Sequence, residues 1–337
     1  MRKSKIKKII IVLLVVTFSL VMSACIDNGI SSGTEDASLS GRLVFEKDDE
    51  VENQGGLIVL KKDSKEVARK YNEYDKEKFN FANLNSKEEY TLNVYKLGDD
   101  KYSKTVVLNE GQNDLGKITL ELERAGQDEK NGVFILEINT EYSPMEKDDV
   151  RKALAYAINK KELSDTAENL LDNPEKGNRY TTQKANRIIT PAQFGNDGNK
   201  YLNLEQDISK ANSLLNKDYT ITINYVGGEF YNELTNKIKK INEINNLNVK
   251  FNVEDFNSEE YNKAPVSLKV WSSNLRSPLF SYKEIIDLDK NDKDLLNKIK
   301  MNLDSSKRAL EYLNEFEENL IKEGKIIPVY YRASYEE

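Results

Sequence analysis

Two patterns of hydrophobic and polar positions divide the chain. Between residues 41 and 124, short apolar stretches are separated by turns and charged loops. The stretch 57–60 (LIVL) is a continuous apolar run, whereas Tyr90, Leu92 and Val94 alternate with polar residues. Short strands at this spacing are typical of a β-sandwich. We therefore predict a small all-β sandwich domain over residues 41–124.

The second half of the chain mixes both periods. Apolar positions alternate along 219–225, recur at helical spacing along 230–241 and alternate again along 247–253. A strand, a helix and a strand at this separation predict two parallel neighbours joined by a crossover. A further strand at 266–271, two helices at 295–323 and a last strand at 326–331 complete the pattern. These elements predict an α/β domain over residues 132–333, after a polar linker.

The stretch 139–163 (NTEYSPMEKDDVRKALAYAINKKEL) predicts an amphipathic helix that follows an extended, proline-containing approach. Apolar residues fall on one helical face, and Arg151 is expected among the residues that point to solvent. Asp148 or Asp149 is placed to cap the first turn. Farther along, Asn203 is expected to cap the next helix. Glu317 belongs to a group of glutamates that we predict to be a solvated helix face.

The first 24 residues have the features of an export signal. Basic residues precede an apolar run from Ile9 to about Met22, which is too short to span a membrane, and small residues precede Cys25. Residues 21–25 (VMSAC) resemble a lipobox, which implies a diacylglyceryl thioether on Cys25. An ordinary secretory signal with an incidental cysteine is the alternative. Residues 25–40 would then tether the protein to the extracytoplasmic face of the cell membrane.

Composition excludes several functions. The chain carries a net charge of −7, which becomes −12 without residues 1–24, and it has no concentrated basic stripe for nucleic acid. It contains no histidine, which excludes histidine-dependent triads and the usual catalytic zinc sites. The acidic run 287–294 lacks the glycine and the final glutamate of a calcium loop. We predict a protein that is not an enzyme and that has no cofactor and no metal site.

The stretch 139–163 also resembles a signature of family 5 extracellular solute-binding proteins, the peptide and nickel receptors of ABC importers. Residues 211–215 (ANSLL) and 327–331 (IPVYY) are similar to two further motifs of this family. The resemblance covers residues 132–331 and implies one lobe of a type II periplasmic-binding-protein-like fold. It also implies an ABC permease and a peptide or another small solute as partners.

The chain departs from this family in two ways. The half that builds most of the other lobe is replaced by the predicted sandwich, whose segment 79–94 resembles prealbumin-like, carboxypeptidase-regulatory repeats. In peptide-binding relatives a Trp-x-x-Asp segment pairs with the peptide amine, but here Asn274 stands where the aspartate would be, and Arg276 adds positive charge. A carboxylate-bearing or neutral solute suits these residues better than an α-amine.

The resemblance implies ligand contacts from Trp271, Asn274 and Arg276, and the carboxyl end of a predicted strand adds Tyr225. Each has a structural alternative: Trp271 also fits a packing residue, and Asn274 and Arg276 also fit solvated loop residues. Two functions remain open at this point. One is a truncated or diverged solute-binding lipoprotein, and the other is a surface interaction lipoprotein whose receptor lobe binds no small solute.

Overall fold

The computed structural model describes most of the chain beyond residue 34. The described ranges are 35–47, 50–51, 55–73, 78–97, 99–121, 132–171, 179–189, 205–240, 246–254, 263–272, 278–282, 285 and 287–335. The export signal, Cys25, Asn203, Asn274 and Arg276 lie outside them. Within these ranges, no helix has both the length and the apolar character needed to cross a bilayer.

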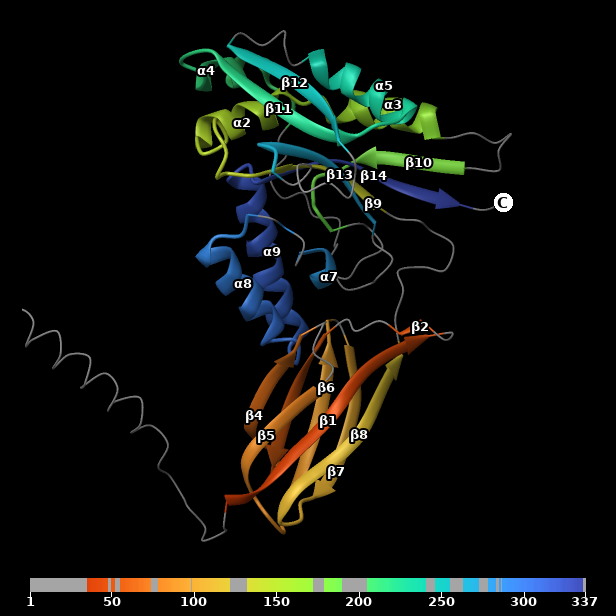
Figure 1. Ribbon diagram of the computed structural model, residues 1–337, viewed down its shortest axis with the longest axis vertical. Coiled ribbons are helices and arrows are strands. Elements are labelled where there is room, and N and C mark those ends of the chain that lie inside the picture. The colour runs from red at the N-terminus through yellow and green to blue at the C-terminus, as the bar shows by residue number, and fades with distance from the viewer. Residues whose placement is uncertain are drawn as a thin grey trace, which may run out of the picture.

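The first domain is a sandwich of two sheets, as the alternating pattern predicts (Figure 1). One sheet contains β1 (Glu35–Lys47), β2 (Glu50–Val51), β5 (Lys78–Asn85) and β8 (Gly111–Glu121). The other contains β3 (Gly56–Lys62), β4 (Lys65–Asn72), β6 (Glu89–Lys96) and β7 (Asp99–Val107). β1 begins inside the segment 25–40 that the sequence assigned to a tether, because Ala37 and Leu39 are buried between the sheets.

β3 is buried on both faces. Ile58 and Leu60 pack into the core between the two sheets. Leu57 and Val59 point the opposite way and belong to the core cluster of the second domain. A sheet with one face in water alternates apolar and polar residues, whereas a strand covered on both faces is a continuous apolar run. The uninterrupted stretch 57–60 is therefore explained by a second domain that covers the outer face of β3.

The second domain contains a mixed sheet of six strands within the described residues, in the order β10-β14-β9-β13-β11-β12. These strands are β9 (Gly132–Ile138), β10 (Arg179–Lys184), β11 (Tyr219–Val226), β12 (Leu247–Glu254), β13 (Val266–Ser272) and β14 (Ile326–Tyr335). β11 is parallel to β12 and to β13, as the strand-helix-strand pattern predicts. β9 is antiparallel to both of its neighbours, and all seven of its residues are buried.

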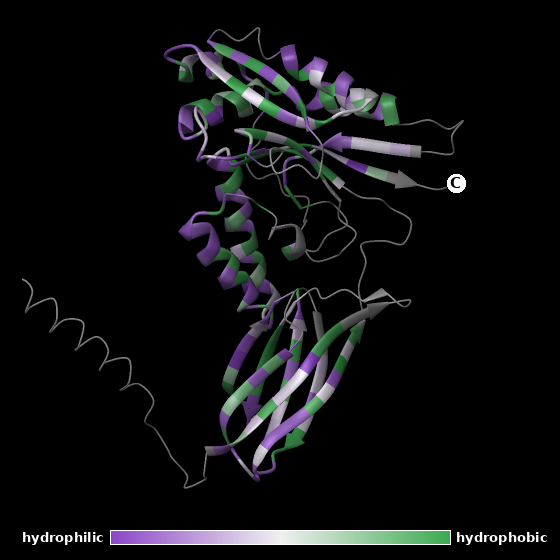
Figure 2. Ribbon diagram, in the orientation of Figure 1, coloured by the Kyte–Doolittle hydropathy of each residue, from purple (hydrophilic) through white to green (hydrophobic). Residues whose placement is uncertain are grey.

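Helices cover both faces of this sheet, and the apolar residues of the strands lie between these layers (Figures 1 and 2). One face packs against α2 (Asp148–Ala157), α3 (Lys160–Leu171), α4 (Ile208–Leu214) and α5 (Glu229–Ile238). The other packs against α7 (Leu279–Tyr282), α8 (Lys290–Lys300) and α9 (Ser306–Lys322). The predicted fold class, an α/β lobe preceded by a small sandwich, is confirmed.

The structure corrects the predicted start and length of the helix in 139–163. Lys147 is the N-cap residue and no side chain caps the first turn, so the predicted aspartate cap is wrong. Asp148 instead forms ion pairs with Lys152 and Arg151. The helix ends before Ile158, whose backbone is extended, and a second helix starts where Asn159 Oδ1 accepts a 3.0 Å hydrogen bond from a backbone amide. A local cap therefore interrupts an apolar stripe that looked continuous.

The next helix also starts later than predicted. α4 begins at Ile208, and its cap is Asp207, whose Oδ1 accepts a 2.8 Å hydrogen bond from the amide of Lys210. Gln206 donates a 3.1 Å hydrogen bond to the carbonyl of Ala157, so it joins α4 to α2.

The two domains are joined by polar contacts around the shared apolar cluster. Arg69 of β4 donates a 2.5 Å hydrogen bond to the carbonyl of Met301, at the end of α8. Lys300 forms a 3.1 Å ion pair with Glu73, and its ammonium lies 5.2 Å from the centroid of the Tyr71 ring. Because backbone, charge and apolar contacts coincide, the sandwich is packed firmly on the α8–α9 layer (Figure 1).

A buried ion pair contradicts the predicted solvated face of α9. Glu317 is fully buried and pairs with Arg187, which is 2% exposed. The other carboxylate oxygen of Glu317 accepts hydrogen bonds from the amides of Ile188 and Ile189, at 3.1 and 2.8 Å. Burial raises the pKa of Glu317, while the charge of Arg187 opposes that shift. The pair therefore anchors the segment after β10 to α9.

Candidate functional site

Several strands of the second domain end at one edge of the sheet. β11, β13 and β14 run in the same direction, because β13 and β14 are both antiparallel to β9. β13 ends opposite Gly132, the first residue of β9, and Gly132 pairs on its other side with Arg332 of β14. α5 begins just after the end of β11. This is the position at which open α/β sheets bind ligands. We call this region the strand-end edge.

Tyr225 lies at this edge but is largely occupied by packing. Its side chain is 6% exposed, and its hydroxyl donates a 3.0 Å hydrogen bond to Asn232 Oδ1. Its ring meets Phe251 edge-on at 6.1 Å and Tyr231 at 6.4 Å. Tyr225 belongs to the core that α2–α5 cover.

Trp271 lies near the end of β13 on the other face of the sheet. It is 8% exposed and belongs to the core that α7–α9 cover, together with Val133 and Tyr331. Tyr225 and Trp271 are thus placed at the same edge but on opposite faces, so the structure does not bring these two predicted site residues together. The other two, Asn274 and Arg276, lie outside the described residues.

A group that the sequence analysis missed lies at the same edge. Phe134 stacks on Tyr330 with ring centroids 4.8 Å apart, and Tyr231 of α5 lies 6.3 Å from Phe134. Arg332 follows Tyr330 by two residues and therefore shares its face of β14. A Cβ added at Gly132 would come within 3.3 Å of Arg332 Nε, so the glycine lets this side chain lie against β9.

Arg332 and Tyr330 have polar atoms without partners. Arg332 Nε and the Tyr330 hydroxyl are both buried, and neither makes a hydrogen bond within the described part of the chain. Burial raises the pKa of Tyr330 above its ordinary value, and the positive charge of Arg332 opposes that shift. The hydroxyl therefore stays protonated near neutral pH. The sequence feature that could have revealed this group is Arg332, which directly follows an apolar strand in the segment 327–332 (IPVYYR).

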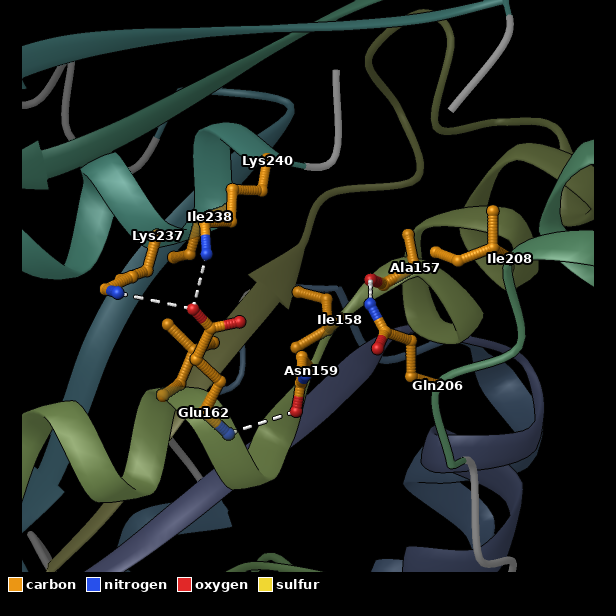
Figure 3. A pocket seen from close by; sticks show the side chains of 10 residues that line it. Ala157, Ile158, Asn159, Glu162, Gln206, Ile208, Lys237, Ile238 and Lys240 are labelled. Atoms are coloured by element: carbon orange, nitrogen blue, oxygen red, sulfur yellow. Dashed lines mark hydrogen bonds and ion pairs between the residues drawn. The ribbon is translucent and has the colours of Figure 1, made fainter. Parts of the chain in front are cut away.

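The second domain also contains a cavity of about 450 Å³ between α2, α3, α4 and α5 (Figure 3). Glu162 accepts hydrogen bonds there from Lys240 at 2.6 Å and Lys237 at 3.3 Å. Both hydrogen bonds lower the pKa of Glu162, and the bond from Lys240 has the larger effect. Both lysines lie at the carboxyl end of α5, whereas the strand-end edge is at its amino end. The cavity is therefore separate from that edge.

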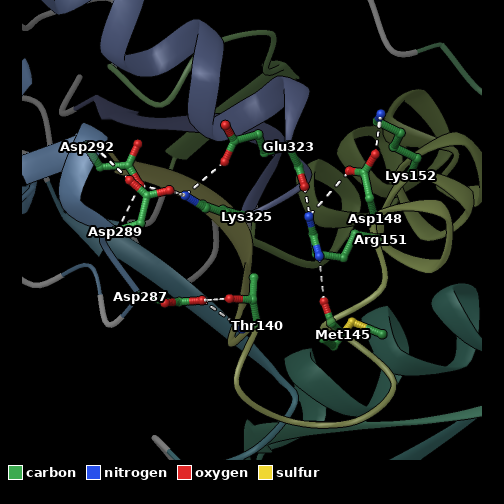
Figure 4. A network of polar contacts seen from close by, with 10 residues as sticks. All are labelled: Thr140, Met145, Asp148, Arg151, Lys152, Asp287, Asp289, Asp292, Glu323 and Lys325. Carbon is green, nitrogen blue, oxygen red and sulfur yellow. Dashed lines mark hydrogen bonds and ion pairs between the residues drawn. The ribbon is translucent and has the colours of Figure 1, made fainter. Parts of the chain in front are cut away.

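The aspartates of 287–294 are engaged by protein groups (Figure 4). Asp287 accepts a 2.8 Å hydrogen bond from the amide of Thr140. Asp289 and Asp292 form the capping box of α8, and both accept from Lys325, at 2.7 and 2.6 Å. Burial by itself lowers the pKa of Lys325, but the adjacent carboxylates raise it above its ordinary value. No group of three metal-ligating side chains occurs among the residues that the structure describes.

Solved structures that resemble this chain are substrate-binding proteins, and several of them are described as peptide-binding. A putative peptide-binding protein AppA from Clostridium difficile matches with a TM-score of 0.50 and 14% identity, over 64% of this chain and 51% of that one. CtaP, an ABC transporter substrate-binding protein from Listeria monocytogenes, matches with a TM-score of 0.51 and 16% identity, over 61% and 45%. A dipeptide-binding protein from Pseudoalteromonas sp. SM9913, solved with Met-Leu, gives 0.50 and 18%, over 64% and 45%.

The second domain has the fold of one lobe of a periplasmic binding protein. The matched share of the chain is about as large as this domain, and the chain spans about half the length of the structures it matches. At these identities the comparison establishes the fold. No family model matches the sequence, and no curated protein matches it.

Proposed function

We propose that this protein is an extracytoplasmic, membrane-anchored lipoprotein that acts as a receptor-like substrate-binding component of a peptide-class ABC importer. The observation that carries the proposal is the α/β lobe, whose fold is that of substrate-binding proteins for peptides. Its strand-end edge presents aromatic rings together with the unpartnered polar atoms of Arg332 and Tyr330. A lobe of this kind supplies one wall of a solute site. The proposal includes an ABC permease as the partner and a peptide or another small solute as the ligand, by analogy with these binding proteins.

The test is binding to the purified protein. A peptide that binds the native state raises the melting temperature, because binding stabilises the folded form by mass action. We expect short peptides to raise the melting temperature in a saturable way, with at most modest affinity, because one lobe buries less of a ligand than the roughly 70–90% that is usual. A flat response across peptides, free amino acids and metal chelates would contradict a role in solute binding.

The anchor is tested separately at Cys25. In cells that express the protein, a radiolabelled fatty acid should be incorporated into the wild type, and the protein should fractionate with membranes. Cys25→Ser should lose the label and appear in the medium or the soluble extracytoplasmic fraction. Equal labelling of both proteins would show that Cys25 is not the lipid site.

A second candidate is a surface protein-interaction lipoprotein that captures no solute. The specific observation in its favour is that Tyr225 and Trp271 are largely buried on opposite faces of the sheet. Capture of a defined partner protein from the cell surface, combined with a flat solute screen, would favour this function. Neither candidate is an enzyme.

A further inference from the structure

The strand-end edge contains two hydrogen-bond donors without an acceptor. The Tyr330 side chain is 0% exposed, and its hydroxyl has no partner within the described residues. Arg332 Nε is also buried without a partner. A buried donor left unsatisfied destabilises a protein by about 1–3 kcal/mol, so such groups are usually paired. Tyr330 and Arg332 both have such a donor on the same face of β14, which suggests that a single group accepts hydrogen bonds from both.

Tyr330 and Arg332 lie two residues apart on the same face of β14, so their side chains are neighbours. The charge of Arg332 acts on Tyr330 and also on Tyr231, in the first turn of α5. The group that satisfies both donors must accept hydrogen bonds from a neutral hydroxyl and from a cationic guanidinium. An anionic oxygen fits this requirement best, because hydrogen bonds between ionised partners are about twice as strong as neutral ones.

The amino end of α5 also favours an anion at this place. Its N-cap is Gly228, and no side chain accepts from the amides of the first turn. Unpaired amides at a helix amino end carry partial positive charge and attract anions. The rings of Phe134 and Tyr231 beside Tyr330 form an apolar wall, which strengthens a charged interaction by excluding water.

We propose that Arg332 and Tyr330 bind an anionic oxygen of the solute, from a carboxylate or a phosphate group, at the strand-end edge. This inference rests on the proposed receptor function and names the chemical class of its solute. Arg332 provides the charge and the planar donor geometry that suits oxyanions. Tyr330 provides a directed second donor, and its stack on Phe134 holds the hydroxyl in place.

Three probes separate the sources of the oxyanion: a mixed tetrapeptide library with free carboxyl termini, the same library with amidated carboxyl termini, and inorganic phosphate. The readout is the probe concentration that gives the half-maximal rise in melting temperature of the purified protein. We expect the free-acid library to act at a concentration roughly ten- to a hundredfold lower than the amidated library, as for a lost hydrogen bond to a charged group. If phosphate alone stabilises the wild type and Arg332→Gln abolishes that effect, the oxyanion is a phosphate group.

Variants test the two donors. Arg332→Gln should weaken binding of the free-acid library roughly tenfold or more and leave binding of the amidated library unchanged. Tyr330→Phe keeps the ring stack and removes a buried hydroxyl that has no partner. It should therefore raise the melting temperature measured without probe, and still weaken binding of the free-acid library. Arg308→Gln, an exposed position on α9, is the matched control and should bind as the wild type does.

The outcomes distinguish this inference from the function on which it rests. Equal binding of the free-acid and amidated libraries combined with no response to phosphate, or wild-type binding by Arg332→Gln, overturns the oxyanion site and leaves the receptor function standing. Failure of the wild type to bind any of the three probes overturns both.

Discussion

Arg151 Nε donates a 2.7 Å hydrogen bond to the backbone carbonyl of Glu323, at the end of α9 (Figure 4). Its Nη1 donates another 2.7 Å bond to the carbonyl of Met145, in the turn before α2. Arg151 is only 8% exposed, although its place in the amphipathic pattern predicted a solvated residue. It joins a helix on one face of the sheet to the end of a helix on the other face.

The residue after Glu323 explains how close these helices come. Gly324 has a φ of +65°, and a Cβ at this position would lie 2.9 Å from Arg151 Cβ. We expect Gly324→Ala to lower the free energy of unfolding by about 1–3 kcal/mol, from backbone strain and steric overlap together. Gly111→Ala is the matched control, because Gly111 has a φ of +82° with nothing within 4 Å of an added Cβ. Urea denaturation should show the larger loss at Gly324, and equal losses would contradict the proposed overlap.

Arg151→Met should be more disruptive than its charge alone suggests. The substitution leaves two carbonyl oxygens without their donor, so we expect a loss of about 2–4 kcal/mol in the free energy of unfolding. Lys152→Met is the control, because Lys152 makes an exposed ion pair with Asp148 that contributes about 0.5 kcal/mol or less. Chemical denaturation of both variants measures the difference, and a loss below 1 kcal/mol for Arg151→Met would contradict the bridging role.

The Arg187–Glu317 pair gives a third prediction. Removing one partner of a buried ion pair leaves an uncompensated charge, so Arg187→Met should destabilise the protein by about 3–5 kcal/mol. Replacing both residues with leucine should recover only part of this loss, because the amides of Ile188 and Ile189 then lack their acceptor. A double-mutant cycle by thermal denaturation measures the coupling. Full recovery in the double variant would show that the amides find other acceptors.

The contact between the domains predicts that they unfold together. Val59 is fully buried on the outer face of β3, so Val59→Lys places a charge in the cluster that the two domains share. Calorimetry should show one cooperative transition for the wild type and two separate transitions for Val59→Lys. Val67→Lys is the control, because Val67 is 48% exposed and its substitution should leave a single transition. Two transitions in the wild type would contradict the coupling.

Lys160 should make the free energy of unfolding depend on pH. Its side chain is buried and donates a 3.2 Å hydrogen bond to the carbonyl of Ala185. Burial, aided by the charge of Lys184, lowers the pKa of Lys160 from 10.5 to about 8. Between pH 8 and 10.5 the unfolded chain therefore holds a proton that the folded protein has lost, so this group makes stability rise with pH.

The check is a comparison with Lys160→Met in urea titrations at pH 7 and pH 10.5. Relative to this variant, the wild type should gain up to about 3 kcal/mol over that range, since one pKa unit corresponds to about 1.4 kcal/mol. Lys161→Met, at an exposed residue that pairs with Asp165, should show no such difference. If the free energy of unfolding changes equally with pH in the wild type and in Lys160→Met, Lys160 keeps its ordinary pKa.

Periodicity in the sequence was sufficient for the fold class, because a buried face repeats every two residues in a strand and every 3.6 in a helix. It predicted the parallel pair β11 and β12 and the sandwich, but it could not place element boundaries that depend on single caps, such as those made by Asn159 and Asp207. Of the candidate site, Tyr225 and Trp271 were located at strand ends, yet their opposite faces became visible only in the paired sheet.

The sequence by itself determined which segments form strands and helices, and in the run 57–60 it already contained the sign of a strand covered on both faces. Only the tertiary structure decided which layer covers that strand, and which charged residues are buried. Arg151, Arg187 and Glu317 look like surface residues in any window of sequence, because their partners are 172 and 130 positions away. Long-range packing selects such pairs, and no local pattern records them.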